Sequence, residues 1–277
     1  MAIVMDGKEV ANHLYDELAI RIKKLNKKPS LTVILVGDNE ASKIYVKNKI
    51  KACERLGIDS TVINCDKNIP EEELAEIIEG LNEDENCDGI LVQAPLPEHI
   101  DATKIFNLIS KDKDVDGFNN YNVGALTKNS DCFIPCTVKG IGYLLDYYNI
   151  SLAGKDVTVI GRSNIVGKPL ASYLTNKDAT VTICHSKTKD LRSKTINADI
   201  IIVATGCAHL IDDSFIKDGA VVIDVGISRV EGKLCGDVYF EKVKDKCSFI
   251  TPVPGGVGPM TVAMLMNNVV EAAERRK

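Results

Sequence analysis

Tyr45 and Lys49 are the side chains of this chain that most suggest chemistry. They are four residues apart in a segment of helical character, so the phenol and the ammonium share one helix face and can act on one ligand. Spacing alone does not establish such a role, because tyrosine and lysine at this interval usually form a solvated helical face. The rest of the chain has to supply the pocket.

Gln93 and Asp116 extend this candidate site. Gln93 follows Val92 at the end of an apolar run typical of a buried strand, and Asp116 lies in the loop 114–118. Loop carboxylates are most often only solvated, but Gly117 and Phe118 allow a sharp turn that buries an apolar side chain and fixes the direction of the carboxylate.

A second candidate site is the turn that follows the strand 157–160. A helix starts directly after this turn, so backbone N–H groups and the positive helix end can bind a pyrophosphate. The turn departs from G-x-G-x-x-G, and a purely structural turn before a helix is the alternative. The residues predicted to contact a dinucleotide here are Gly161, Arg162, Ser163, Ile165, Val166 and Gly167.

The end of the next strand bears on the choice of dinucleotide. NAD sites commonly place Asp or Glu there for the ribose 2′-hydroxyl, whereas this chain has His185 and Ser186. Together with Arg162 in the turn after strand 157–160, these residues favour the 2′-phosphate of NADP. His185 could instead be a surface residue without a cofactor contact. Ile227 follows a later strand end, where backbone groups would approach a nicotinamide.

A glycine-rich loop at 252–261 precedes the last helix. It can bring backbone N–H groups close to a ligand, or it can be only a stiff loop with a helix start, since Pro259 suits a first helical turn. Its predicted ligand contacts are Pro254, Gly255, Gly256, Pro259 and Thr261.

Strands and helices alternate along the chain, which predicts parallel α/β sheets. We expect two α/β domains with a cleft between them, the second a Rossmann-type sheet. Residues 1–136 plus 257–277 form the first domain, residues 137–256 the second, and the last helix packs on the first. The expected strands are 31–37, 61–65, 89–93, 157–160, 180–184, 200–204 and 220–225, with helices at 40–56, 71–81, 138–148, 168–174 and 259–276.

The composition excludes several classes of protein. With 277 residues, 45% hydrophobic and 26% charged, the chain resembles a globular protein of two domains. A net charge of -5 argues against general nucleic-acid binding, and no apolar run is long enough to cross a membrane. The nine cysteines are scattered, which fits reduced thiols in a cytoplasmic protein and predicts no disulfide. The cysteines and the four histidines show no metal-ligand pattern, so no metal is expected.

These motifs, in this order, resemble the bifunctional methylenetetrahydrofolate dehydrogenase/methenyltetrahydrofolate cyclohydrolases over nearly the whole chain. The resemblance implies oxidation of 5,10-methylenetetrahydrofolate with NADP, then hydrolysis to 10-formyltetrahydrofolate, by a homodimer in one-carbon metabolism. The matching segments are 6–8, 45–49, 93–97, 114–118, 161–167 and 254–261.

The resemblance also implies roles for the candidate residues. Lys49 would be the base or water activator in hydrolysis, with Gln93 holding it. Tyr45 would stack on the folate, and Asp116 would anchor the pterin. A lysine is a poor base at neutral pH, so Lys49 must be desolvated or lie beside the cationic methenyl carbon.

The chain departs from the family pattern near the candidate pocket, at Ala94, Asn119, Asn120, Ala125 and Val138. Two alternatives therefore stand beside the bifunctional enzyme. One is a dehydrogenase of the same fold with weak or absent cyclohydrolase activity. The other is an NADP-binding regulator without catalysis, against which the joint presence of Lys49, Gln93 and Asp116 speaks.

Overall fold

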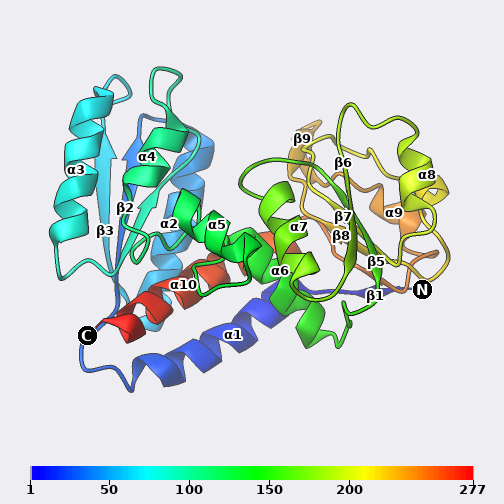
Figure 1. The fold of residues 1–277 in the computed structure, drawn as a ribbon, viewed down its shortest axis with the longest axis horizontal. Helices are drawn as coiled ribbons and strands as arrows, with labels where there is room; N and C mark the ends of the chain where they lie inside the picture. The colour runs from blue at the N-terminus through cyan, green and yellow to red at the C-terminus, as the bar shows by residue number, and fades with distance from the viewer. Residues whose placement is uncertain (1, 277) are drawn as a thin grey trace. The chain divides into compact units, whose positions relative to one another are not determined.

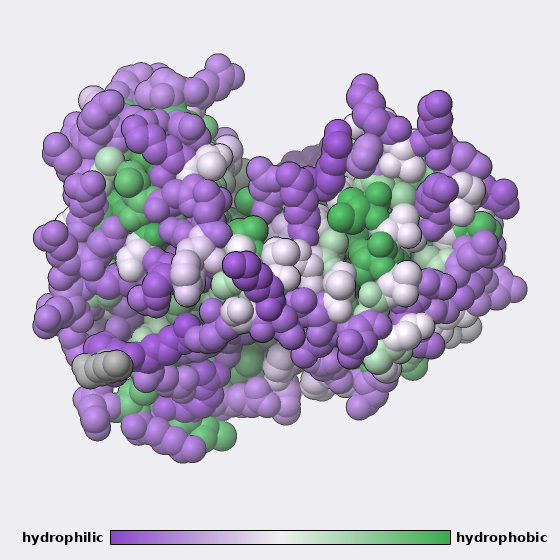
Figure 2. Space-filling model, in the orientation of Figure 1, coloured by the Kyte–Doolittle hydropathy of each residue, from purple (hydrophilic) through white to green (hydrophobic). Residues whose placement is uncertain are grey.

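The computed structural model describes residues 2–276, which divide into two compact units. One unit comprises His13–Cys136 together with the chain from Val262 onward, and it carries Lys49. The other comprises the chain up to Asn12 together with Thr137–Thr261, and it carries the glycine turn at Gly161. Charged and polar residues cover most of the visible surface of both units (Figure 2).

The unit that carries Lys49 is built on a three-stranded parallel sheet with the order β3-β2-β4 (Figure 1). Strand β2 is buried along nearly its whole length, and Ile34 and Ile90 lie in a core that also includes residues of the flanking helices. The strands are β2 (Ser30–Val36), β3 (Asp59–Cys65) and β4 (Gly89–Val92), and the helices are α2 (Glu40–Leu56), α3 (Glu71–Glu83), α4 (Ala102–Leu108) and α5 (Asn120–Thr127).

The other unit contains a six-stranded parallel sheet with the order β1-β11-β8-β7-β5-β6. Strand β5 lies between β6 and β7, so the strand order reverses beside it, and the crevice at such a reversal is where open α/β sheets bind ligands. The strands are β1 (Ile3–Val4), β5 (Asp156–Ile160), β6 (Thr180–Cys184), β7 (Ile200–Val203), β8 (Val221–Asp224) and β11 (Phe249–Ile250).

Smaller elements complete this second unit. An antiparallel hairpin of β9 (Ser228–Val230) and β10 (Lys233–Cys235) follows the end of β8. The helices are α6 (Cys136–Tyr147), α7 (Gly167–Thr175), α8 (Leu191–Thr195) and α9 (Phe240–Val243), with one 3-10 turn, η1 (Asp213–Phe215). Helix α1 (Gly7–Ile22) and helix α10 (Val257–Arg275) each contribute residues to both units.

The compact units differ from the predicted domains at the N-terminus and at residues 257–261. Residues up to Asn12 group with the six-stranded sheet because β1 pairs with β11, with Ile3 opposite Phe249. Packing of the last helix on the first domain is confirmed, since the Asn268 side chain donates to the carbonyls of Val115 and Ile134. The functional domain boundaries themselves stay a prediction.

Candidate functional site

Lys49 is buried on helix α2 and faces the end of strand β4. Its side chain has 8% relative exposure, and its Nζ donates a hydrogen bond of 3.0 Å to Gln93 Oε1. The Gln93 amide nitrogen donates in turn to the Ala94 carbonyl at 2.6 Å, which fixes which end of the amide faces the lysine. An ammonium that is removed from water and held by a neutral acceptor is a group prepared to act on a ligand.

Helix α2 presents Lys49 because of how it is capped and packed. Asn39 accepts the Ser42 N–H at the start of the helix, and Gly57 ends it in a left-handed conformation with φ 70°. The buried face includes Val46 and Ala52, at three-residue intervals on either side of Lys49. Tyr45, one turn earlier, keeps 43% exposure, so its ring is available to a ligand.

Asp116 lies close enough to Lys49 for the two charges to interact. Burial raises the pKa of Asp116, while the Lys49 ammonium and the Cys136 thiol oppose that rise. Cys136 is itself held by the Asn268 amide and donates to the Val115 carbonyl. The structure therefore brings Lys49, Gln93 and Asp116 together, whereas the Val92 side chain is 2% exposed and belongs to the core.

Asp114 holds the loop that contains Asp116, a role that was not predicted from the sequence. It is 1% exposed and accepts hydrogen bonds from the backbone N–H groups of Gly117 and Asn119 and from the Asn122 side chain. Burial raises its pKa to about 6 despite these donors. Its position two residues before Asp116 and three before the turn at Gly117 is the sequence signal of this role.

The raised pKa of Asp114 predicts a pH-dependent stability. Protonated Asp114 favours the folded state, so its contribution is full below pH 4 and is lost as the pH rises through about 6. For Asp114→Asn, the unfolding free energy relative to the parent should increase by about 3 kcal/mol between pH 4 and pH 7. Urea unfolding of the parent and the variant between pH 4 and pH 7 measures this change in free energy. The exposed Asp112→Asn is the control, and its free-energy difference from the parent should not change with pH. The same pH-independent difference for Asp114→Asn would show that Asp114 does not have a raised pKa.

The phosphate turn in the other unit leaves no room for side chains at two glycines. Gly161 has φ 127°, and a Cβ there would lie 2.2 Å from the Ala204 carbonyl oxygen. A Cβ on Gly167 would lie 2.2 Å from the Gly161 carbonyl oxygen. Ser163 Oγ accepts the N–H groups of Val166 and Gly167, so the serine orders the first turn of α7. This close backbone approach before a helix suits a pyrophosphate.

His185 and Arg162 follow paired strand ends. Ile160 of β5 is opposite Cys184 of β6, and the Gly161 N–H donates to the Cys184 carbonyl, so the residues after both strands share one edge of the sheet. His185 Nδ1 accepts the Lys187 N–H at 3.1 Å, which leaves its Nε2 as the proton-bearing nitrogen. Arg162 and Ser186 are exposed, and so is Ile227 beyond β8.

The second glycine-rich loop belongs to the same unit as the phosphate turn. Gly255 has φ 111°, and the Gly256 N–H donates to the Pro252 carbonyl at 2.8 Å. A Cβ on Gly256 would lie 2.6 Å from that same carbonyl oxygen, so the turn requires glycine there. Thr261 Oγ1 lies 3.2 Å from Thr137 Oγ1. Pro254, Pro259 and Thr261 therefore lie in a different compact unit from Lys49, Gln93 and Asp116.

Most departures from the family pattern have structural roles here. Asn119 caps α5 by accepting the Tyr121 N–H, and its amide donates to the Ile109 carbonyl. Val138 is fully buried, and Ala125 is 9% exposed. Ala94 contributes only its carbonyl to Gln93. Asn120 is exposed, and its N–H donates to the Asn107 side chain.

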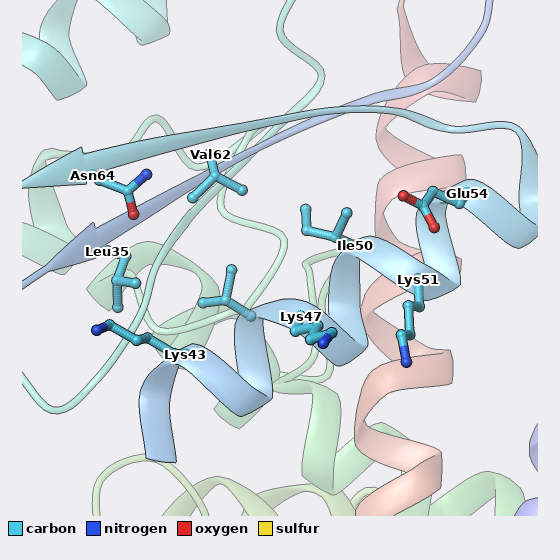
Figure 3. A pocket seen from close by; sticks show the side chains of 9 residues that line it. Leu35, Lys43, Lys47, Ile50, Lys51, Glu54, Val62 and Asn64 are labelled. Atoms are coloured by element: carbon cyan, nitrogen blue, oxygen red, sulfur yellow. The ribbon is translucent and has the colours of Figure 1, made fainter. Parts of the chain in front are cut away.

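A separate cavity of about 370 Å³ lies between helix α2 and strands β2 and β3 (Figure 3). None of the predicted substrate residues lines it, and of its α2 side chains only Val46 belongs to the buried face that carries Lys49. We therefore assign the candidate chemistry to the Lys49 side of α2. The cavity is lined by Leu35, Lys43, Val46, Lys47, Ile50, Lys51, Glu54, Val62 and Asn64.

Among residues 2–276, no helix combines the length and the apolar character that a membrane span requires. In the same range, no group of three or more His, Cys, Asp or Glu side chains is placed to hold a metal ion.

The two units carry features expected of a two-domain dehydrogenase: one has a glycine turn between a parallel strand and a helix, and the other has a buried lysine beside Gln93 and Asp116. Residues 5–116 match the catalytic-domain model of tetrahydrofolate dehydrogenase/cyclohydrolase, and residues 135–277 match the NAD(P)-binding-domain model. The chain therefore belongs to the tetrahydrofolate dehydrogenase/cyclohydrolase family.

Relatives match over the full length of the chain. The bifunctional protein FolD of Bacillus subtilis is 51% identical, over 99% of this chain and 98% of the relative. The crystal structure of the bifunctional FolD enzyme of Campylobacter jejuni is 50% identical, covers 100% of both chains and superposes with a TM-score of 0.99. The Trypanosoma brucei FolD, solved with NADP and an inhibitor, is 37% identical over 99% of this chain and 98% of that chain, with a TM-score of 0.94.

Proposed function

We propose that the protein oxidises 5,10-methylenetetrahydrofolate with NADP and hydrolyses the methenyl product to 10-formyltetrahydrofolate. The observation that carries the hydrolytic half is the buried Lys49 ammonium on Gln93 with Asp116 beside it. A regulator that only bound NADP would have no use for this arrangement. The test is turnover of methylenetetrahydrofolate with NADP and then with NAD, followed by identification of the folate product.

Lys49 is the proposed base in the hydrolysis. A water oxygen bonds to the methenyl carbon, and one proton of that water passes to Lys49 Nζ. As the bond from the carbon to N5 breaks, the remaining hydroxyl proton is transferred to N5 and the oxygen becomes the carbonyl of the formyl group on N10. The step requires Lys49 to act as a proton acceptor. Gln93 holds the lysine through Oε1 at 3.0 Å, and the exposed Tyr45 ring lies against the folate.

NADP fits the turn at the end of β5. The missing side chains at Gly161 and Gly167 and the N-terminus of α7 suit a pyrophosphate. The exposed Arg162 and Ser186, with His185, suit the 2′-phosphate, because no carboxylate follows β6 directly. NADP, when bound, accepts the hydride, and this chain orients it against the substrate. Ile165, Val166 and Ile227 are proposed further contacts.

Asp116 is the proposed anchor of the pterin ring. A carboxylate accepts hydrogen bonds from the donor edge of a pterin, and such a contact is worth on the order of 1.5 to 3 kcal/mol. Asp116→Ala should therefore weaken binding of a folate analogue by roughly tenfold or more. Calorimetric titration measures this, with the exposed Asp112→Ala, four residues earlier, as the matched control. Equal affinity in a folded Asp116→Ala protein would place Asp116 outside the pocket.

The glycine-rich loop provides the remaining proposed substrate contacts, from Pro254, Gly255, Gly256, Pro259 and Thr261, with Val92 contributing only backbone groups. A homodimer and a cytoplasmic location also stay proposals. The first rests on the family resemblance and the second on the cysteine usage, and sedimentation equilibrium tests the first.

A further inference from the structure

Two buried carboxylates, Asp224 and Asp237, lie at the carboxyl end of the NAD(P)-binding sheet and take no part in the chemistry proposed above. Asp224 ends strand β8 with 3% exposure, and Asp237 follows the β9–β10 hairpin and is fully buried. Burying a carboxylate costs free energy unless hydrogen bonds compensate for the lost water. The contacts of these two side chains therefore indicate what the pair holds in place.

Asp224 joins the end of β8 to the segment that follows the hairpin. Its Oδ1 accepts the N–H groups of Gly226 and Asp237, each at 3.0 Å, and its Oδ2 accepts the Val238 N–H at 2.9 Å. A Cβ on Gly236 would lie 1.9 Å from Asp224 Oδ2. Glycine at 236 is therefore what allows the carboxylate to reach these donors.

Asp237 extends the connection to the loop after β7. Its Oδ2 accepts hydrogen bonds from the N–H and the hydroxyl of Thr205, at 2.6 and 2.8 Å, and from the Gly206 N–H at 3.0 Å. Strands β7 and β8 are neighbours, with Val203 opposite Asp224. One carboxylate oxygen thus fixes the chain after β7 to the chain after β8.

The other oxygen of Asp237 faces the turn after β8. A Cβ on Gly226 would lie 2.1 Å from Asp237 Oδ1, so the carboxylate packs directly against this glycine. Within residues 2–276, Oδ1 has no hydrogen-bond partner although it is buried. Its position is set by packing on the backbone that leads to Ile227, which is 46% exposed.

The two loops that Asp237 connects lie where a nicotinamide is expected. Dinucleotides bind outside the carboxyl ends of the strands, and in this sheet β7 and then β8 follow β5, which carries the phosphate turn. We propose that Asp237 is a positioning residue for the nicotinamide half of NADP, because it fixes Thr205 and Gly206 against the turn at Gly226. This inference rests on the proposed NADP-dependent function.

Asp237→Asn is the direct test, because asparagine matches aspartate in size but lacks the charge that holds three donors. We expect the kcat/KM for NADP-dependent dehydrogenation to fall at least tenfold and the Kd for NADP, measured by calorimetry, to rise. Hydrolysis of supplied methenyltetrahydrofolate without NADP should change less than twofold, because Lys49 belongs to the other compact unit.

Asp199→Asn is the matched control. Asp199 immediately precedes β7, at the amino end of the same strand, where it accepts the Asp156 N–H and pairs with Lys217. We expect it to lower the Tm without changing the NADP constants. Thr205→Val, which removes one of the three donors to Asp237, should shift the NADP constants in the same direction as Asp237→Asn, but less.

The inference is wrong if a folded Asp237→Asn protein has the same Kd and kcat/KM for NADP as Asp199→Asn, or if it loses hydrolysis and dehydrogenation equally. If Asp237→Asn does not fold, unchanged NADP constants in Thr205→Val would overturn the inference. A parent protein that binds NADP but does not oxidise methylenetetrahydrofolate would refute the proposed function instead. The NADP affinities of the variants would still decide the role of Asp237.

Discussion

Lys49→Met should abolish hydrolysis of methenyltetrahydrofolate and leave NADP binding nearly unchanged. Methionine keeps the length and the apolar stem of lysine but has no proton acceptor for the attacking water. General acid–base catalysis typically contributes 10²- to 10⁴-fold to a rate, so we expect at least a hundredfold loss. The decay of methenyl absorbance measures hydrolysis, and calorimetry measures the Kd for NADP.

Lys47→Met is the control for this substitution. Lys47 lies on the same helix but lines the cavity on another face of α2, so its loss should leave hydrolysis within about twofold of the parent, as is usual for surface changes. A Lys49→Met protein that hydrolyses at the parental rate would show that another group activates the water. The Gln93 contact would then be only structural.

Arg162→Ala should weaken NADP binding far more than NAD binding. A charge-assisted contact to the 2′-phosphate is worth on the order of 1.5 to 3 kcal/mol, which corresponds to a loss of roughly tenfold to a hundredfold. NAD lacks that phosphate, so its apparent constant should stay within about twofold. Initial dehydrogenase rates at varied NADP and varied NAD measure both constants.

The control for charge alone is Arg192→Ala. Arg192 lies in α8 of the same unit and donates to the Ser214 carbonyl, so the variant removes an equal charge away from the phosphate turn. Its NADP constant should match that of the parent. If Arg162→Ala weakened NADP and NAD binding equally, Arg162 would not be a contact of the 2′-phosphate.

Local patterns predicted helices α2, α3, α6, α7 and α10 and the longer strands, whereas helix α1 and the short helices α4, α5, α8 and α9 were not predicted. Helix α2 runs from Glu40 to Leu56 as expected, because Asn39 and Gly57 are strong start and stop signals within a few residues of the helix they bound. The parallel strands other than β1 and β11 were predicted, apart from one or two residues at some ends, because buried strands are continuous apolar runs.

Long-range pairing could not be predicted in the same way. Strand β1 has only two residues, and its partner β11 lies near the other end of the chain, so no local pattern connects them. The grouping of residues up to Asn12 with the six-stranded sheet follows from that pairing. The same limit applies to Asp237, whose role depends on Thr205 and Gly226 and not on its sequence neighbours.

The two carboxylates of the 114–118 loop show where site prediction stops. Asp114 and Asp116 are equivalent by composition, and sequence reasoning singled out only Asp116. The structure separates them, because Asp114 is held by Asn119 and Asn122, whereas Asp116 lies near Lys49. Only tertiary contacts can tell a carboxylate that holds a loop from one that is available to a ligand.

The most direct test of the bifunctional assignment is one continuous assay of the parent protein with 5,10-methylenetetrahydrofolate and NADP. We expect NADPH absorbance to rise and methenyltetrahydrofolate to be converted further to 10-formyltetrahydrofolate, whereas the Lys49→Met protein should accumulate the methenyl compound. NADPH formation with no enzymatic hydrolysis by the parent protein would contradict it and leave a dehydrogenase alone.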